Sequence, residues 1–123
     1  MRLTIALTLA AGLTGTAALA HHGWSWADGE QMTLQGAVQR VSMAPPHPMI
    51  HVTAADGVWQ VDLGNPSQTQ RSGFTAETAK VGTAVTILGN RSQDQTKRHM
   101  KAVRVTIEGR NYDMYPERIR KTK

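Results

Sequence analysis

The sequence predicts an all-β protein, a small five-stranded barrel of the OB type with one short helix between its third and fourth strands, preceded by a cleaved signal peptide. Two observations predict this fold. Five short stretches alternate apolar and polar residues at the period of a strand, and one helix signal separates the third stretch from the fourth. With 123 residues, the chain has room for one domain. A β-sandwich of similar size fits the same pattern.

The first expected strand covers residues 31–43, and its apolar positions change side along the chain. Met32 and Leu34 share one parity, whereas Val41 has the other. Because such a change needs one extra residue in the strand, we expect a bulge or bend, and Gly36 is the residue that accommodates it most easily.

The later elements follow from alternation and from capping residues. Asp56-Gly57 predicts a hairpin turn between the second and third strands. Asn65 is a good N-cap for the short helix, Pro66 suits its first position, and Gly73 can end it. The four remaining strands are expected at residues 49–54, 58–63, 83–88 and 100–107.

Residues 1–20 have the parts of a secretory signal peptide. Arg2 supplies the positive charge, an apolar stretch follows, and Ala18-Leu19-Ala20 is an A-x-A cleavage site. A membrane anchor is the alternative, because the stretch approaches the length of a spanning helix, but four threonines dilute it. We therefore expect a periplasmic or secreted protein that begins at His21 and has no membrane span after cleavage.

The amino-acid composition excludes several kinds of site and partner. The chain has no Cys, which excludes disulfides, thiolate metal ligands and cysteine nucleophiles. The net charge is +5, but aromatic residues do not interleave with the basic ones, so no nucleic-acid partner is expected. Many of the basic residues gather at the end of the chain. We expect residues 21–110 to form the OB-like barrel domain and residues 111–123 a basic, solvated C-terminal tail.

Cleavage after Ala20 would change the chemistry of His21. A terminal histidine carries a free α-amine and an imidazole, with ordinary pKa values of about 7.7–8.0 and 6.5, so both can bind a metal near neutral pH. Together they close a chelate ring, and a third nitrogen would complete a flat site that suits Cu(II). This chemistry resembles the histidine brace of copper proteins. The alternative is that both terminal histidines are only solvated.

The sequence offers several further ligands for such a site. His22 can bind through its ring or its amide. His47 lies between two prolines that stiffen the backbone, and it shares its parity with Met49 and His51. His99 precedes the fifth strand and can reach the same end of a barrel. The predicted metal ligands are His21, His22, His47 and His51.

No catalytic motif is present, so the sequence does not predict an enzyme. Trp24 and Trp26 are expected to clamp the N-terminal segment onto the barrel. One alternative function is a metal-free ligand-binding module of the cell envelope, with Trp59, Tyr112 and Tyr115 as contacts. Another is a copper-dependent oxidase or oxygenase, which would need an open coordination position and a substrate groove.

Several motifs resemble those of an uncharacterised family of small exported bacterial proteins, the domain-of-unknown-function family 6152. The matching motifs are His21-His22-Gly23-Trp24, Pro46-His47, Asn65-Pro66-Ser67, Gly73-Phe74 and Lys80-Val81-Gly82. The chain departs at Pro45, where the family usually has Asn. The resemblance implies no function, but it implies that the His-His start and His47 belong to one pattern.

The features together predict a periplasmic protein that binds copper for carriage or buffering. Its partners would be the metal ion and another envelope protein that receives the metal. The sequence does not indicate an oligomeric state.

Overall fold

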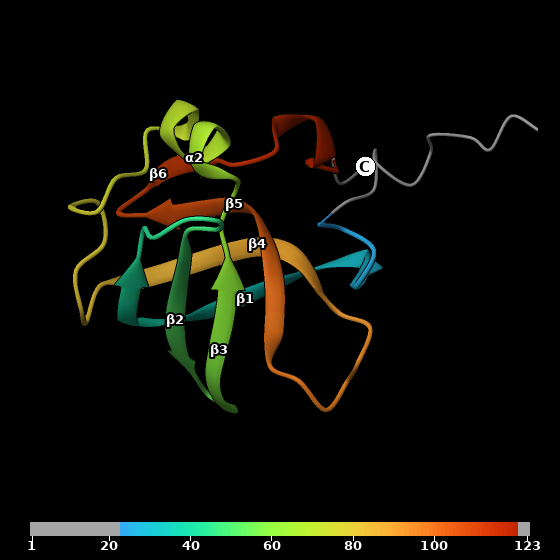
Figure 1. Ribbon diagram of the computed structural model, residues 1–123. Coiled ribbons are helices and arrows are strands. Elements are labelled where there is room, and N and C mark those ends of the chain that lie inside the picture. Colours follow the sequence, from blue (N-terminus) through green and yellow to red (C-terminus); the bar gives the residue numbers. More distant parts are fainter. Residues whose placement is uncertain (1–22, 121–123) are drawn as a thin grey trace, which may run out of the picture.

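The computed structural model describes residues 23–120, and within this range the protein is mostly β (Figure 1). The expected leader, its cleavage point, His21 and His22 lie outside the described residues. The strands are β1 (Ala27–Ser42), β2 (Met49–Ala54), β3 (Gly57–Asp62), β4 (Ala84–Ser92), β5 (His99–Ile107) and β6 (Arg110–Asp113). The described helices are α2 (Pro66–Ser72) and the short 3-10 helix η1 (Pro116–Arg118). Neither is long and apolar enough to cross a membrane.

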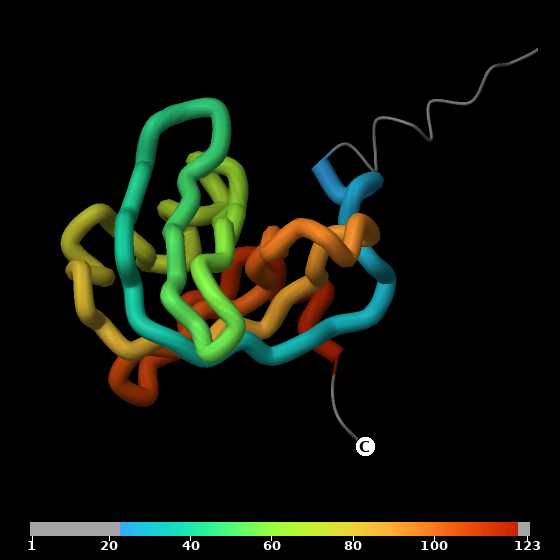
Figure 2. The backbone as a smooth tube through the Cα atoms, turned by 90° about the horizontal axis from the view of Figure 1, so that it is seen from below, coloured from blue at the N-terminus to red at the C-terminus, as the bar shows by residue number. Residues whose placement is uncertain are grey.

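The strands form one six-stranded sheet in the order β3-β2-β1-β4-β5-β6, with antiparallel neighbours throughout. In addition, β3 pairs with β5 in parallel, through Gln60 with His99, Val61 with Met100 and Asp62 with Lys101. The pairings therefore run in a closed circuit from β1 through β2, β3, β5 and β4 back to β1. Figure 2 shows the described start of the chain beside the β4–β5 connection, coloured orange.

All five expected strands are present, but the expected number was too low, because β6 is a sixth. This strand lies in the stretch expected as a solvated tail. Tyr112, Met114 and Tyr115 are all buried there, and Tyr112 packs edge-on against Phe74 with 5.7 Å between ring centres. The tail expected from residue 111 was therefore wrong at its start. β6 has only four residues among several charges, so alternation alone gave little signal.

The change of parity in β1 is real, but Gly36 is not its site. The register with β2 shifts between Val38 and Arg40, which places the extra residue at Gln39. Gly36 instead allows close approach of β2: a Cβ there would lie 2.7 Å from the Val52 side chain and even closer to the carbonyl oxygen of Thr53. The glycine is needed for contact between strands, not for the bulge.

Helix α2 begins and ends as its capping residues predict. The Asn65 side chain accepts a hydrogen bond from the Gln68 backbone N–H at 2.8 Å. Gly73 adopts the left-handed conformation at φ 89°, which ends the helix without the strain a side chain would cause. Figure 1 shows α2 beside β6, at one end of the strand circuit.

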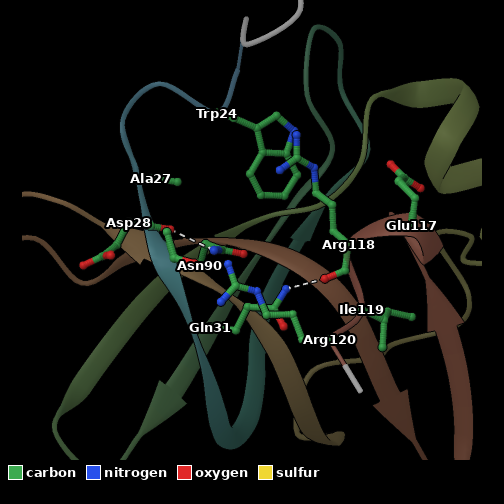
Figure 3. Close-up of a pocket in the computed structure, with 10 residues that line it drawn as sticks. Trp24, Ala27, Asp28, Gln31, Asn90, Glu117, Arg118, Ile119 and Arg120 are labelled. Carbon is green, nitrogen blue, oxygen red and sulfur yellow. Dashed lines mark hydrogen bonds between the residues drawn. The ribbon is translucent and has the colours of Figure 1, made fainter. Parts of the chain in front are cut away.

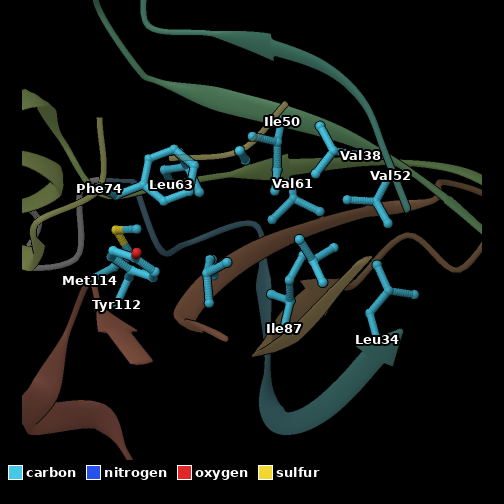
Figure 4. Close-up of a cluster of buried hydrophobic side chains, with 14 of the residues drawn as sticks. Leu34, Val38, Ile50, Val52, Val61, Leu63, Phe74, Ile87, Tyr112 and Met114 are labelled. Carbon is cyan, nitrogen blue, oxygen red and sulfur yellow. The ribbon is translucent and has the colours of Figure 1, made fainter. Parts of the chain in front are cut away.

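The core fills the interior of this circuit (Figure 4). Ile50 on β2, Val61 on β3 and Met100 on β5 are fully buried and lie at adjacent positions of paired strands. Burial of each aliphatic side chain of this size stabilises the fold by about 1.5–3 kcal/mol. Because strand residues alternate between faces, the neighbours of these three residues lie on the outer face of the same strands.

Candidate functional site

Two rows of mostly polar side chains lie on that outer face. The first row runs from His51 on β2 through Gln60 on β3 to His99 on β5. The second runs from Met49 through Asp62 to Lys101 on the same three strands. Paired residues project from the same side of a sheet, so each row brings side chains from distant parts of the sequence together. The β3–β5 pairing makes both rows possible.

His99 and Asp62 form the central contact of this face. The His99 Nε2 atom lies 2.9 Å from Asp62 Oδ2, and the two side chains are 25% and 15% exposed. Gln60 Nε2 donates to the other carboxylate oxygen at 3.1 Å. When His99 is neutral and its Nε2–H donates to the ionised carboxylate, its lone pair lies on Nδ1, which no described residue hydrogen-bonds.

The environment of Asp62 keeps it ionised. Burial acts to raise the pKa of this carboxyl, but hydrogen bonds from His99 and Gln60 and the charges of His99 and Lys101 outweigh that effect. The pKa of Asp62 therefore lies below its usual value of 3.8. A carboxylate that stays ionised near neutral pH can hold the neighbouring imidazole in one tautomer and one orientation.

The two N-terminal tryptophans clamp the start of the described chain onto this face, as expected. Trp26 stacks on the His99 ring, with 4.0 Å between centres and an angle of 8° between planes. Trp24 meets Tyr115 edge-on at 4.9 Å. Gln93 on the β4–β5 connection adds hydrogen bonds to the carbonyl oxygens of Ser25 and Ala27. Four contacts thus hold residues 24–27 in place.

Lys101 lies directly beneath this segment. Its side chain is buried, and its Nζ atom lies 5.1 Å from the centre of the Trp24 ring and 5.5 Å from that of Tyr115. A Cβ placed on Gly23 would be 3.4 Å from this Nζ. Burial lowers the pKa of Lys101 below 10.5, partly opposed by Asp62. The first described residue therefore lies close to the Lys101 ammonium group, at one end of the second row.

The predicted ligands occupy different settings. His21 and His22 fall outside the described residues. His47 is exposed in the connection between β1 and β2, whereas His51 is half-buried and its Nδ1 atom has no hydrogen-bond partner. Among residues 23–120, no group of three or more His, Asp or Glu side chains is arranged to hold a metal ion. The described part of the chain alone does not form a three-ligand site of this kind.

Sequence reasoning missed Asp62, Gln60 and Lys101 as parts of this face. The outward parity of Asp62 in its strand was readable, and so was the position of His99 beside the fifth strand. The alternation of apolar and polar residues does not predict the register between β3 and β5. It is this register that brings Asp62 and His99 into contact. The sequence analysis placed His99 before the fifth strand. In the structure it is the first residue of β5.

A polar pocket lies between the start of β1 and the C-terminal segment (Figure 3). Its volume is about 400 Å³, and Trp24, Arg118 and Arg120 are among the residues that line it. Three hydrogen bonds hold its walls together: Gln31 to the Arg118 carbonyl at 2.6 Å, Arg120 to the Gly29 carbonyl at 2.9 Å, and Asn90 to the Asp28 carbonyl at 2.8 Å. The pocket shares Trp24 with the clamped segment.

The three aromatic residues expected as ligand contacts are not available for that role. Trp59, Tyr112 and Tyr115 are 2%, 8% and 7% exposed. The Trp59 indole N–H donates to Asp56 at 2.8 Å, and both tyrosines pack against other aromatic rings. These residues stabilise the fold from inside.

Comparison with known proteins places the chain in a family. No curated protein resembles the chain closely enough to count as a match. The model of one family, described as a family of unknown function (DUF6152), matches residues 9–101. This match runs from the expected leader to Lys101 in β5, so it includes the His-His start, His47, Asp62 and His99. It confirms the resemblance that the sequence motifs indicated, and it assigns no activity. The chain belongs to the DUF6152 family.

Proposed function

We propose that this protein is an exported metal-binding protein, suited above all to copper, which it carries or buffers in the periplasm. The scaffold we propose is an OB-type barrel. Its support is the pairing order: β1 pairs with β2 and β4, β3 pairs with β5 in parallel, and α2 lies between β3 and β4.

The metal would be held by a chain end created by cleavage after Ala20. The new α-amine and the ring of His21 form a chelate, and both groups lose their protons easily near neutral pH. Nitrogen ligands in a flat arrangement favour Cu(II), which also leads the divalent metals in affinity. With no Cys in the chain, copper can be bound here only by nitrogen, oxygen and thioether donors.

One observation carries the proposal: the segment that follows His21 and His22 is fixed on a face that carries metal-binding side chains. Gly23 lies beside Lys101, and Trp26 covers His99. Consecutive Cα atoms are 3.8 Å apart, so the Cα of His21 lies within about 7.6 Å of that of Gly23. A fixed attachment point this close limits the entropy that the chain end would lose on binding metal.

The proposed role is carriage and not turnover. The motifs of common catalytic sites are absent from the sequence. Oxygen consumption by the copper-loaded protein with a reductant would distinguish an oxidase or oxygenase from a carrier, and we expect none above the rate of free copper.

The proposal is tested by copper titration of two proteins, one that begins at His21 and one with three alanines before it. The extension turns the His21 amine into an amide. Because neither His21 nor His22 is then the third residue, the extension creates no competing copper site of the kind formed by a terminal amine and a histidine in third position. We expect the copper affinity to fall by at least about 100-fold, because the loss of a residue that only supports a ligand already costs about 10–100-fold. Equal affinities would rule out a site at the chain end.

The pocket of Figure 3 supports a second candidate function, a metal-free module that binds a small anion. Its volume is in the range of ligand sites. The residues that line it include Arg118 and Arg120, which would bind the anion, and also Asp28 and Glu117. This candidate predicts that small carboxylates raise the melting temperature and that Arg120→Gln removes the effect. Carboxylates without any effect on the melting temperature would eliminate it.

A further inference from the structure

We propose that the pocket of Figure 3 takes a hydroxycarboxylate, a small molecule that carries a carboxylate and a hydroxyl group. In this assignment Arg118 and Arg120 bind the carboxylate, and the amide oxygen of Asn90 accepts a hydrogen bond from the hydroxyl. The inference rests on the second candidate function, for which it names the class of ligand, and it does not depend on the proposed metal site.

Two paired strand residues form the base of the pocket. Gln31 on β1 and Asn90 on β4 lie opposite each other and project from the same face of the sheet. The Gln31 amide donates to the Arg118 carbonyl at 2.6 Å, and Arg120 donates to the Gly29 carbonyl at 2.9 Å. These contacts hold the C-terminal segment against β1, so both arginines line the same cavity as Asn90.

Asn90 has a hydrogen-bond acceptor that no described residue uses. The side chain is 7% exposed, and its Nδ2 atom donates to the Asp28 carbonyl at 2.8 Å and to the Glu30 carbonyl at 3.4 Å. The Oδ1 atom is buried without a partner. Figure 3 shows it turned away from Asp28, toward the space between Trp24 and Arg120. Because an unpaired buried acceptor is unfavourable, a ligand that brings a donor is preferred to one that does not.

The ligand reaches this buried oxygen when a neighbouring side chain moves, and Arg120 is suited to that movement. Asn90 and Arg120 donate to the carbonyl oxygens of adjacent residues, Asp28 and Gly29, so the two side chains are neighbours. Arg120 is exposed, and its bond to Gly29 is to a neutral acceptor. A guanidinium binds a carboxylate more strongly than a neutral carbonyl. Arg120 therefore leaves Gly29 as it takes up the ligand.

The positive groups around the cavity favour an anion. The Arg118 guanidinium lies over the Trp24 ring, 3.9 Å from its centre, and no described carboxylate pairs with it. A stacked guanidinium keeps its N–H edge available for a carboxylate. Lys101 pairs with Asn90 across β5 and β4 and adds a buried ammonium group, 5.1 Å from the centre of the same ring.

The acidic residues of the lining do not make an ammonium site beside Asn90. The Asp28 carboxylate already accepts a hydrogen bond from the Glu30 backbone N–H at 3.0 Å, and Figure 3 shows it pointing away from the cavity. Glu117 is exposed, so water and salt screen its charge. An ammonium group at Asn90 would be repelled by Lys101 and by both arginines, whereas a hydroxyl makes the same hydrogen bond without this repulsion.

Three ligands of similar size test the assignment. Lactate, propionate and alanine differ in the group beside the carboxylate, which is a hydroxyl, a hydrogen or an ammonium group. Their dissociation constants for the exported protein are measured at pH 7 by titration of amide chemical shifts, which also show whether Gln31 and Asn90 respond. We expect lactate to bind about tenfold more tightly than propionate, because it pairs the Asn90 oxygen, and more tightly than alanine.

The same titrations distinguish failure of this inference from failure of the candidate function on which it rests. Equal affinities for lactate and propionate, or tighter binding of alanine than of lactate, would overturn the hydroxycarboxylate and leave the anion site standing. Binding of none of the three would overturn the anion site as well. The copper titrations decide the proposed metal site separately.

Two variants and a matched control locate the contacts. Asn90→Leu keeps the size of the side chain but removes its oxygen, so lactate and propionate should bind equally. Arg120→Gln should weaken both by about tenfold. Arg98→Gln removes an exposed arginine outside the pocket and should bind like the wild type.

Circular dichroism shows whether each variant is folded, because Asn90→Leu also loses two hydrogen bonds to β1. If this variant does not fold, the ligand series and Arg120→Gln decide the assignment. A folded Asn90→Leu protein that still prefers lactate would overturn the role of Asn90. Equal losses of affinity in Arg98→Gln and Arg120→Gln would overturn the location in this pocket.

Discussion

His47 and His99 both lie beside β3, but their side chains are held differently. His47 precedes Pro48, whose carbonyl accepts a hydrogen bond from the Leu63 N–H at 2.9 Å, just beyond the end of β3. His99 pairs with Gln60, within β3. Around His47 the chain is stiff, with prolines on both sides, but its side chain is exposed. Around His99 the side chain itself is held, by Asp62 and by Trp26.

The difference shows that a stiff backbone and a fixed side chain are separate properties. Proline limits φ and the conformation of the preceding residue, but it leaves the χ angles of its neighbours free. A paired strand with a hydrogen-bonding partner and a stacked ring limits the χ angles as well. A metal ligand needs the second property, because ordering a free side chain on binding costs free energy.

The largest expected effect on stability comes from the close contact between β4 and β5, the strand that carries His99. Gly89 on β4 faces Ala102 on β5, and a Cβ on Gly89 would lie 2.8 Å from the Met100 side chain and closer still to the Lys101 carbonyl oxygen. Gly89→Ala should therefore lower the free energy of unfolding by about 3 kcal/mol, measured by urea denaturation. Gly29→Ala is the matched control, because nothing lies within 4 Å of its Cβ. A similar loss in both variants would contradict this account of β5.

The next largest effect on stability is expected at Trp26, whose ring stacks on His99. Trp26→Ala removes the stacked ring and should lower the free energy of unfolding by about 1–2 kcal/mol, because aromatic pairs contribute beyond the area they bury. Trp26→Phe keeps a ring and should recover much of the loss. If the alanine variant unfolds at the same urea concentration as wild type, the N-terminal segment is not clamped as described.

A smaller effect concerns acid stability. The pKa of Asp62 is lower in the folded protein than its usual 3.8, so the unfolded chain binds more protons as the pH falls below about 5. The stability that this carboxylate contributes is present above that range and is lost as the pH drops through its folded pKa. Asp62→Asn should flatten the fall in unfolding free energy between about pH 5 and pH 2. An unchanged slope would show that the contact with His99 does not stabilise the fold.

The smallest effect is expected at the other histidine. His47→Ala removes an exposed side chain without a partner among the described residues, and it should change the free energy of unfolding by no more than about 0.5 kcal/mol. A loss above 1 kcal/mol in the same urea titration would show that the connection between β1 and β2 makes contacts that this comparison overlooks.

The sequence predicted the fold better than the site, for reasons that particular residues show. Alternation in β2 and the caps Asn65 and Gly73 are local signals, so the second strand and the helix were predicted closely. The bulge was expected at Gly36 but lies at Gln39. Its position depends on the pairing register of β1 with β2, which no local sequence pattern predicts. The His99–Asp62 contact depends on the β3–β5 register in the same way, and it joins residues 37 positions apart.

The central claim is that proteolysis creates a copper-binding chain end at His21. Intact mass measurement of the exported protein under native conditions tests it most directly, because one spectrum gives both the first residue and the bound metal. The account predicts a polypeptide mass that begins at His21 and, after exposure to copper, one added copper ion per chain. A chain that begins at another residue, or one that begins at His21 and retains no copper, would contradict it.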